Sequence, residues 1–390
     1  MFYKVFSISL IFVIASCTPE SQILVENELP INKNATEETK ALYINLKKLS
    51  GTGVMFGHQD DLAYGYSWWA EPGRSDVKES TGSYPAIYGW DLGDLELKKT
   101  SNLDDVEFHN MKNWIKEGYD RGGVITISWH MNHPITQGNS WDKVSAVKEI
   151  LPGQLNHNKL INYLDEFALF INDLKGKNGE QIPIIFRPFH EHNGDWFWWG
   201  KGVTEEADYI TLWRFTIDYL KDQKKLNNLL YAYSPDRSRM NINNFTESYF
   251  YGYPGDEYVD IIGLDNYWDL GHPNNTTSDK DKKSDFIKSI TELVQIADSL
   301  GKIPALTETG LDGLHNFKWW TEILAEGLLE NLHTKRIVYV HTWRNANAEK
   351  YGSKDHFFAS HPNHASASNM KKFRDMEIFL FEDELPDMYK

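Results

Sequence analysis

The sequence is nearly free of cysteine and is poor in basic residues. Its 390 residues contain a single cysteine, Cys17. One cysteine cannot form a disulfide within the chain or build a zinc or iron–sulfur site from cysteine ligands. The 40 Lys and Arg residues stand against 56 Asp and Glu residues, a formal net charge of −16 at pH 7. A field of this sign does not attract the phosphates of nucleic acids or an anionic membrane surface, so we expect neither as a partner.

Extended apolar runs are also rare, and the run at the N-terminus, Val5–Ile14, is too short to span a bilayer as a helix. A lysine before it and small residues after it are typical of a signal peptide. The segment Ile14-Ala15-Ser16-Cys17 resembles the bacterial lipobox, which implies cleavage before Cys17 and lipid attachment to its thiol. We therefore predict a signal peptide over residues 1–16 and a lipidated flexible tether over residues 17–38. An ordinary signal peptide with an incidental cysteine is the alternative.

The rest of the chain, residues 39–390, has no Pro/Gly/Ser-rich linker and no visible repeat of 20 to 50 residues, so we predict a single domain. No dense acidic cluster of the kind that resembles a surface-export signal follows Cys17. We expect the lipid to anchor the protein to the outer membrane, facing the periplasm, with the cell surface as the alternative. A monomer is the default expectation for the oligomeric state.

Short runs rich in β-branched and aromatic residues alternate with longer segments in which apolar residues recur every three or four positions. The candidate strands are Val54–Gln59, Ala86–Leu92, Val124–His130, Ile182–Glu191, Leu229–Asp236, Val259–Tyr267, Ile303–Gly310 and Arg336–Trp343. The candidate helices include Leu103–Tyr119, Lys159–Leu174, Glu205–Leu220, Phe286–Leu300 and Trp319–Leu329. This βα alternation predicts an α/β fold, a (β/α)8 barrel. A doubly wound sheet is the alternative, but no Gly-rich dinucleotide loop follows the first strand.

One of these helices has clear boundary signals. Ser284 and Asp285 are predicted to open it, and Gly301 is predicted to close it before Pro304. We therefore expect this helix to cover approximately residues 286–300.

Polar and aromatic residues are predicted at the ends of nearly all strands, where the active sites of (β/α)8 barrels lie. They include Asp91, His130, Glu191, Asp236, Asp265, Glu308 and Trp343. The segment with the clearest signs of a functional site is Ile184–Gly200. In it an apolar strand leads into His190 and Glu191, and four aromatic residues follow at positions 196–199. Sugars present polar edges and apolar C–H faces, so a sugar site combines hydrogen-bonding groups with flat aromatic rings. Core packing is the alternative explanation for each of these tryptophans.

A second carboxylate comes at the end of the seventh predicted strand, where an apolar run delivers Glu308 just before a glycine turn. In a glycosidase, one carboxyl protonates the leaving oxygen while the other attacks the anomeric carbon or activates water. Glu191 on the fourth strand and Glu308 on the seventh would face each other across the barrel mouth. We therefore predict that these two residues are a catalytic pair.

These motifs resemble glycoside hydrolase family 26, the retaining β-mannanases of the (β/α)8 clan. The resemblance covers about Gly53 to Trp343 and rests on the segments FRPFHE…GDWFWWG, SWH, GLDNYW, TETG and HTWR. Most relatives in the clan have Asn before the acid/base glutamate, whereas family 26 has His, and this chain has His190. The resemblance implies hydrolysis of β-1,4-mannosidic bonds in mannan, galactomannan or glucomannan with retention of configuration, and with no cofactor and no metal.

The resemblance also implies a role for each matched residue. Glu191 would be the acid/base and Glu308 the nucleophile. His130 and His190 would bind the sugar on the nonreducing side of the cleavage point, and Tyr267 would hydrogen-bond Glu308. The further substrate-binding residues would be Trp196 and Trp343 as aromatic walls, and Arg344 one subsite further out.

Two long predicted βα loops, Ala63–Ser83 and Asn132–Gly153, would wall off the distal subsites. A narrowed cleft favours the release of mannobiose, with cleavage inside chains as the alternative. The family also includes xylanases and mixed-linkage β-glucanases, so xylan and mixed-linkage β-glucan are alternative substrates.

Two other classes of protein share some of these features. A metallohydrolase would use histidines, but the zinc-protease pattern needs two histidines at i and i+4 on a helix, whereas His190 and His192 follow a proline at a strand end. His130 and His133 flank a turn, where they would either bind a metal or form hydrogen bonds. A non-catalytic carbohydrate-binding lipoprotein would explain the anchor and the tryptophans, but it does not require Glu191 and Glu308.

Overall fold

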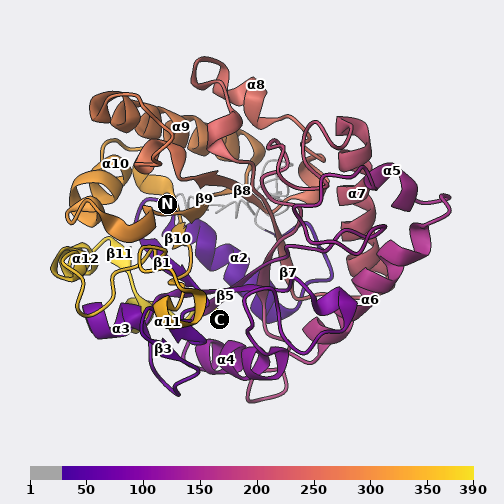
Figure 1. Cartoon of the computed structure of the whole chain (residues 1–390), viewed down its shortest axis with the longest axis horizontal. Helices are drawn as coiled ribbons and strands as arrows, with labels where there is room; N and C mark the ends of the chain where they lie inside the picture. Colours follow the sequence, from indigo (N-terminus) through magenta and orange to yellow (C-terminus); the bar gives the residue numbers. More distant parts are fainter. Residues whose placement is uncertain (1–28) are drawn as a thin grey trace, which may run out of the picture.

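The computed structural model describes residues 29–390, so the predicted signal peptide, Cys17 and the tether up to residue 28 lie outside the described residues. Eight parallel strands form a closed barrel at the centre of the molecule, ringed by helices (Figure 1). In barrel order they are β1 (Val54–Gln59), β4 (Ile87–Asp91), β5 (Val124–Ser128), β6 (Ile184–Arg187), β7 (Leu229–Tyr233), β8 (Ile261–Asn266), β9 (Ile303–Thr309) and β10 (Tyr339–Thr342). The predicted (β/α)8 barrel is confirmed, because β10 pairs with β1 to close the sheet.

Most helices lie around the outside of this barrel, whereas α2 (Glu37–Leu49) packs against the residues that fill its interior (Figure 1). The other helices are α3 (Asp76–Thr81), α4 (Phe108–Asp120), α5 (Val147–Ile150), α6 (His157–Asn172), α7 (Glu206–Asp218), α8 (Phe245–Tyr249), α9 (Asp279–Leu300), α10 (Glu326–Leu328), α11 (Ala348–Tyr351) and α12 (Ala367–Arg374). Three short strands accompany them: β2 (Tyr64–Gly65) and β3 (Trp68–Trp69) form a hairpin, and β11 (Phe379–Leu380) pairs with the start of β1. Among the described residues, we find no helix with the length and apolarity that a membrane span requires.

All the barrel strands are buried on both faces, which explains their nearly continuous apolar sequences. Alternate residues fill the barrel interior, among them Met55, Ile87, Val124, Ile185, Leu230, Ile261, Ile303 and Tyr339. The intervening residues, such as Phe56, Ile125 and Phe186, pack against the helices. The apolar layers therefore fill the interior of the barrel, and the polar residues lie at its mouth, at the C-terminal ends of the strands.

The described chain begins at the opposite end of the barrel. The backbone N–H of Ile31 donates to Asp260 Oδ1 (2.8 Å), and the buried side chain of Asn32 donates to Asn227 Oδ1 (3.1 Å). Asp260 and Asn227 lie just before β8 and β7, at the N-terminal ends of the strands. The tether predicted over residues 17–38 is therefore too long, because the chain already packs on the barrel at Ile31.

Three helices differ from their predicted form. Helix α4 begins at Phe108, not at Leu103. Helix α9 begins at Asp279, not near Ser284, because the side chain of Ser278 accepts the backbone N–H of Asp281 as an N-cap. Its predicted end is confirmed, since Gly301 takes the left-handed conformation, with φ of 67°. The segment predicted as one helix over 319–329 is instead a π-helix, η8 (Trp319–Ala325), followed by α10.

Candidate active site

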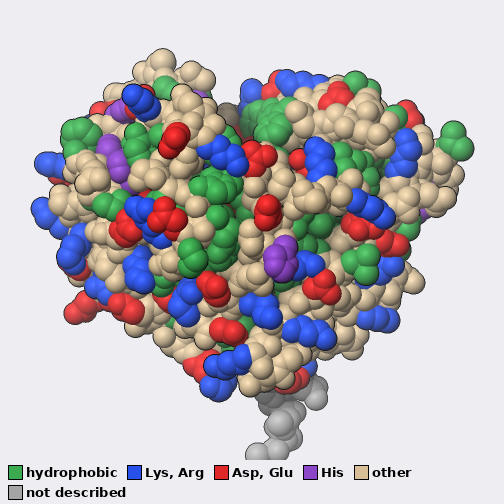
Figure 2. All heavy atoms as spheres, turned by 60° about the horizontal axis from the view of Figure 1, so that its bottom comes forward, with side chains coloured by type: hydrophobic (Ala, Val, Ile, Leu, Met, Phe, Trp, Pro, Cys, Tyr) green, Lys and Arg blue, Asp and Glu red, His purple; other side chains and the backbone are tan. Residues whose placement is uncertain are grey.

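The C-terminal ends of the strands form the mouth of the barrel, where most of the predicted site residues meet. Figure 2 shows the surface hollowed by a notch between two lobes at the upper edge of the molecule. Residues near this mouth come from β4, β5, β6, β7, β8, β9 and β10. The sequence therefore brings residues from the whole length of the domain to one place.

Glu308 reaches the mouth because of a bulge in β9. The pairing of β8 with β9 is regular up to Leu264 opposite Leu306 and resumes with Asp265 opposite Glu308, so Thr307 is an extra residue. Leu306 packs in the helix layer, and with regular alternation Glu308 would face that layer too. The extra residue reverses the alternation. Thr307 then donates to Asp265 Oδ1 (2.8 Å) inside the barrel, and Glu308 also points inward.

Two side chains hold Glu308 in place. Arg187, the last residue of β6, donates to Glu308 Oε2 and also donates to Asp265 Oδ2 at 2.6 Å. Tyr267 donates its hydroxyl to Glu308 Oε1 at 2.8 Å, as the resemblance implied. Arg187 and Asp265 are both buried, and a buried ion pair with good geometry keeps its members in fixed positions. Glu308 therefore has a fixed orientation, with donors on both of its oxygens.

Glu191 lies in a turn beyond β6, and the predicted strand Ile182–Glu191 is too long. The strand ends at Arg187, because the next residue, Pro188, has no N–H to continue the ladder. Glu191 has a φ of 52°, which is uncommon for a residue other than glycine. Its backbone N–H donates to Ser234 O (2.8 Å), and Trp196 donates its indole N–H to Glu191 Oε2 (2.8 Å). These contacts hold the turn in its unusual conformation.

The surroundings of Glu191 favour its protonated form. Burial raises the pKa of Glu191 well above its usual value, and the neighbouring carboxyl groups of Asp236 and Glu308 raise it further. Arg187 acts in the opposite direction but does not reverse the shift. A carboxyl group that stays protonated near neutral pH is suited to the role of a general acid.

One carboxylate oxygen from each of Glu191, Asp265 and Glu308 lies within 4.8 Å of the other two. Retaining glycosidases place their two carboxyl groups about 5–5.5 Å apart, whereas inverting enzymes leave about 6.5–9.5 Å for a water. The approach of Glu191 to Glu308 therefore favours the retaining arrangement. Three carboxylates at this spacing also resemble a cation site, but the guanidinium of Arg187 already provides the positive charge for two of them.

His130 and His190 lie side by side at the mouth, with ring centroids 4.6 Å apart, and their pKa values are shifted in opposite directions. His130 Nδ1 bonds to Asp91 Oδ2 at 2.8 Å. Burial alone would lower the pKa of His130, but the carboxylate of Asp91 raises it above its usual value. Burial and the nearby Arg187 lower the pKa of His190. Of the two rings at the mouth, His130 therefore holds a proton more readily than His190.

The remaining predicted binding residues surround this centre. Trp343 is half-buried, and its ring centroid lies 6.0 Å from that of His130. Trp196 is half-buried on the other side, against Glu191. Arg344 lies further out, where it pairs with Asp104 (2.9 Å). The structure thus places all the predicted site residues other than Cys17 around one mouth, with Arg344 at the edge.

The other two tryptophans of the aromatic cluster belong to the core. Trp198 and Trp199 are buried, and their indole N–H groups donate to the carbonyls of Met131 and His190 (both 2.9 Å). Core packing is therefore the correct explanation for these two, whereas Trp196 lines the cleft.

The histidines considered as metal ligands form hydrogen bonds. His133 is fully buried: its Nδ1 accepts the backbone N–H groups of Ile135 and Thr136, and its Nε2 bonds to Val144 O (2.9 Å). This pattern uses both ring nitrogens to shape the loop after β5. His190 and His192 lie in the turn beyond β6, not on a strand, and have different neighbours. His190 packs against His130, whereas His192 stacks on Tyr209 and bonds to Tyr251 O (2.7 Å).

A cavity of about 520 Å³ opens beside Glu191. Its lining combines polar groups with two indoles, and consists of Glu191, Trp196, Asp236, Ser238, Arg239, Tyr267, Trp268, His272 and Asn274. Because it lies on the acid side of the carboxylate pair, this cavity is suited to the leaving part of a sugar chain.

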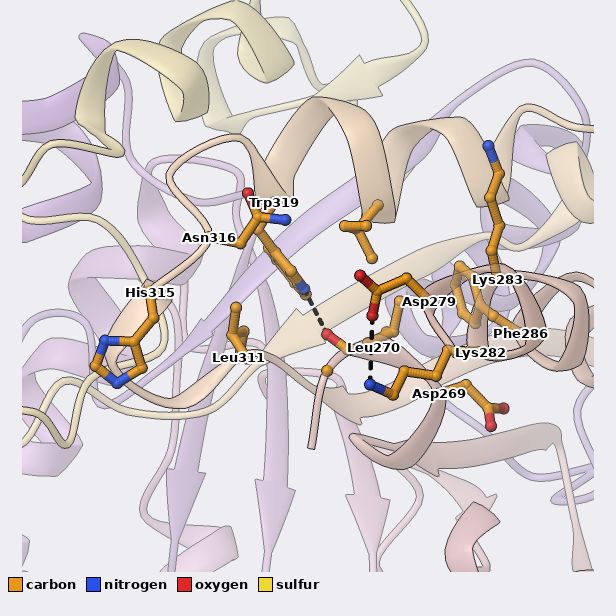
Figure 3. Close-up of a pocket in the computed structure, with 12 residues that line it drawn as sticks. Asp269, Leu270, Asp279, Lys282, Lys283, Phe286, Leu311, His315, Asn316 and Trp319 are labelled. Carbon is orange, nitrogen blue, oxygen red and sulfur yellow. Dashed lines mark hydrogen bonds and ion pairs between the residues drawn. The ribbon is translucent and has the colours of Figure 1, made fainter. Parts of the chain in front are cut away.

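A second cavity, of about 380 Å³, lies between α9, η8 and the 3-10 turn η6 (Trp268–Leu270), as Figure 3 shows. Its polar groups pair with one another: Trp319 donates to Leu270 O (2.8 Å), and Lys282 pairs with Asp279 (3.4 Å). Neither Glu191 nor Glu308 lines it, so it does not compete with the barrel mouth as the active site.

Four functional residues were not singled out as site residues from the sequence: Arg187, Asp91, Asp236 and Asp265. The three acids were recognised only as polar strand ends, and Arg187 only as part of a motif. Their position at strand ends was a signal, but their partners lie far away in the sequence, as with Arg187 and Glu308. The pairings become visible only when the barrel closes.

Comparison with known proteins gives one family. Residues 31–345 match the family described as Glycosyl hydrolase family 26. A protein of Bifidobacterium adolescentis named mannan endo-1,4-beta-mannosidase is 36% identical over 331 residues, which are 80% of this chain and 31% of that protein. A Bacillus subtilis (strain 168) protein of the same name is 30% identical over 274 residues, 67% of this chain and 72% of its own length. The chain thus spans about a third of the first relative.

Solved structures agree with this comparison. A GH26 beta-mannanase from Bacteroides ovatus is 39% identical, with a TM-score of 0.83 over 91% of this chain and 98% of that chain. The similarity therefore covers nearly the whole described domain, including the barrel mouth.

Proposed function

The chain belongs to glycosyl hydrolase family 26, and from this premise we propose that it hydrolyses β-1,4-mannosidic bonds in mannan, galactomannan or glucomannan. The observation that carries the proposal is the pair Glu191 and Glu308, whose carboxylate oxygens approach within 4.8 Å at the mouth of the barrel. The names of the similar proteins from Bifidobacterium adolescentis and Bacillus subtilis support mannan as the substrate. Xylan and mixed-linkage β-glucan are the alternative substrates.

In the first step of the proposed reaction, Glu308 attacks the anomeric carbon. Arg187 and Tyr267 hold its carboxylate in one orientation, so the attacking oxygen is directed toward the cleft. Glu191 delivers its proton to the leaving oxygen, and the leaving sugar lies in the cavity beside Trp196. A covalent glycosyl-enzyme forms, and the configuration is inverted once.

In the second step, Glu191 accepts a proton from water, and the water attacks the anomeric carbon. Formation of the glycosyl-enzyme removes the negative charge of Glu308, which is one cause of the raised pKa of Glu191. The pKa of Glu191 therefore falls in the intermediate, and the same carboxyl group changes from acid to base. The second inversion gives overall retention.

Replacement of each glutamate tests this assignment. We expect Glu308→Ala to abolish turnover of linear mannan and to keep affinity for it, because the nucleophile is lost and the binding residues remain. We expect Glu191→Ala to lower the rate on mannan by about 10²–10⁴-fold, the usual contribution of acid–base catalysis. It should retain much more activity on an aryl mannoside with a good leaving group, which needs no proton.

Initial rates on mannan, the aryl mannoside, xylan and mixed-linkage glucan provide the measurement. A wild-type protein that binds mannan without any turnover would instead be a non-catalytic binding protein. An equally low rate of Glu191→Ala on both mannosides would contradict the acid role.

The loops around the cleft support release of mannobiose. The β2–β3 hairpin and the segment after β10 join into one wall, because the backbone N–H of Ala348 donates to Tyr66 O (2.9 Å). The side chain of Asn347 also donates to Trp68 O (3.1 Å). A wall at the far end of the cleft limits how many sugars fit beyond the cleavage point.

The N-terminal motif supports attachment to a membrane through a lipid on Cys17. Ile31, near the start of the described residues, is bonded to the end of the barrel opposite the mouth, which supports an anchor that leaves the cleft open. The outer membrane, facing the periplasm, is the proposed location.

A further inference from the structure

A third acid, Asp236, lines the same cavity as Glu191. It follows β7 and is 7% exposed. The mechanism above uses Glu191 and Glu308 and gives this third carboxyl group no task. Burial of a carboxyl group costs free energy unless hydrogen bonds compensate for it. Carboxyl groups with such surroundings are common at functional sites, so the contacts of Asp236 are described next.

The backbone of Asp236 is clamped to the turn that carries Glu191. The side chain of Asn193 accepts the backbone N–H of Asp236 and donates to its carbonyl, both at 2.7 Å. The backbone N–H of Glu191 also donates to Ser234 O at 2.8 Å. These three bonds fix the positions of the two chain segments relative to each other. The clamp uses only the backbone of Asp236, so its carboxyl group has no part in it.

The carboxyl group of Asp236 is held separately. Its Oδ1 accepts both the backbone N–H (2.8 Å) and the hydroxyl of Ser238. Such donors stabilise the charged form. Burial nevertheless raises the pKa of Asp236 to about 6. Once it is ionised, Asp236 places a negative charge near Glu191 and raises the pKa of Glu191.

We propose that Asp236 is a positioning residue for the reaction: its carboxylate, fixed beside Glu191 by the Asn193 clamp, keeps Glu191 protonated until the leaving sugar departs. A negative charge close to an acid disfavours the loss of its proton. The inference rests on the proposed role of Glu191 as the acid/base.

Charged groups from four strand ends face Glu191. Asp236, Glu308 and Asp265 raise its pKa, and Arg187 lowers it. Glu308 and Asp265 share the charge of Arg187, whereas Asp236 lies outside that ion-pair network. On the solvent side of Asp236, Arg239 partly offsets its charge, and Arg239 itself pairs with Asp195 (2.6 Å). Asp236 is therefore the acid in this group whose removal leaves the nucleophile and its partners intact.

The test is the pH dependence of kcat/KM in Asp236→Asn. The change removes the charge, keeps the shape of the side chain and leaves the backbone clamp in place. With mannotetraose, kcat/KM falls at high pH as Glu191 loses its proton, and we call this fall the high-pH limb. We expect the limb to move to lower pH by about one unit, which is about a tenfold loss of rate at a given pH on the limb. On 2,4-dinitrophenyl β-mannobioside, whose leaving group needs no proton, the rate of glycosyl-enzyme formation should change little. A purely structural role would lower both rates and leave the limb in place.

Asp195→Asn is the matched control, because it removes a carboxylate from the same turn at an exposed position. Water screens this charge, so the limb should stay at the wild-type pH. If Asp236→Asn does not fold, Asp236→Ser replaces it. Serine also removes the charge and leaves the backbone clamp in place, so the limb should again move to lower pH.

A limb at the wild-type position in folded Asp236→Asn, or in Asp236→Ser where that variant replaces it, overturns the inference. Glu191→Gln distinguishes this outcome from a failure of the proposed function. If Glu191→Gln hydrolyses mannotetraose at the wild-type rate with the same limb, Glu191 is not the acid, and both proposals fail. If Glu191→Gln loses that activity while the limb of the Asp236 variant does not move, only the role of Asp236 is wrong.

Discussion

Glu191 and Glu308 are the same kind of side chain, and their neighbours make them different. Glu308 accepts hydrogen bonds from Arg187 and Tyr267, which are donors suited to a carboxylate. Glu191 accepts one from the neutral indole of Trp196, and burial beside other acids favours its proton. The proposed roles of Glu308 as nucleophile and Glu191 as acid therefore follow from the partners of each residue.

Tyr267→Phe tests how much the donor on Glu308 contributes. The variant loses the 2.8 Å hydrogen bond to Glu308 Oε1 and keeps the ring. A hydrogen bond to a charged group contributes about 1.5–3 kcal/mol, so we expect kcat on mannan to fall by about 10- to 150-fold. The measurement is kcat on linear mannan together with the free energy of unfolding.

Tyr249→Phe is the control for Tyr267→Phe. Its buried hydroxyl donates to the carbonyl of Gly263 (2.9 Å), away from the carboxylates. This control should lose about 1 kcal/mol of stability and keep its kcat. A wild-type kcat in Tyr267→Phe would show that its hydroxyl does not support the nucleophile.

The sequence was sufficient to identify both glutamates, because each follows an apolar run at a strand end. It was not sufficient to identify their partners. Arg187 and Glu308 are 121 residues apart, and local patterns carry no information on such a contact. The charge of His130 depends in the same way on Asp91, which comes from the neighbouring strand.

At the scale of elements, all eight predicted barrel strands are present, and the errors concern their ends. Strand runs are read from apolar patterns, and these patterns do not show where the ladder stops. In β6, Pro188 ends the strand and moves Glu191 into a turn. In β9, the extra residue Thr307 turns Glu308 inward, which simple alternation would not predict.

The start of α9 was also predicted too late. Its first residues, 279–285, are nearly all charged, so they have no apolar period to mark a helix. The cap formed by Ser278 and the acidic residues Asp279 and Asp281 near the helix N-terminus stabilise this extension. Polar capping chemistry and not apolar periodicity sets this boundary.

The β2–β3 hairpin gives an element-scale prediction about products. Trp69 stacks on Tyr64 (centroids 4.8 Å apart, 2° between planes), and Lys350 Nζ lies 3.5 Å from its ring centroid. This packing joins the hairpin to the segment after β10. We expect Trp69→Ala to loosen the wall, so that the first products from linear mannan shift from mannobiose to longer oligosaccharides. A time course of products measures the shift.

Leu169→Ala, an exposed position on α6 and outside the wall, serves as the control and should give the wild-type products. If the wild-type enzyme itself releases long, mixed oligosaccharides first, the cleft is not closed, and the proposed release of mannobiose is wrong.

At the scale of the whole molecule, the barrel separates its two ends by function. Site residues from seven strands collect at the C-terminal ends, while the chain enters at the N-terminal ends through Ile31 and Asn32. Asp260 accepts both the backbone N–H of Ile31 (2.8 Å) and that of Tyr231 (2.9 Å), so the entry point is bonded to the barrel. The described chain therefore starts on the face of the barrel opposite the cleft.

Cys17→Ser tests the anchor. Serine has no thiol for the lipid, so we expect the full-length variant to move from the membrane fraction to the soluble fraction of the producing cells. Because Ile31 is bonded to the end of the barrel opposite the cleft, the kcat of the variant on soluble mannan should stay within about twofold of wild type. Fractionation and mass measurement of the N-terminal peptide check the first expectation, and initial rates check the second. Equal amounts of the variant and the wild type in the soluble fraction would indicate an ordinary signal peptide. A large loss of kcat in a folded variant would instead show that the N-terminal segment reaches the cleft, against the position of Ile31.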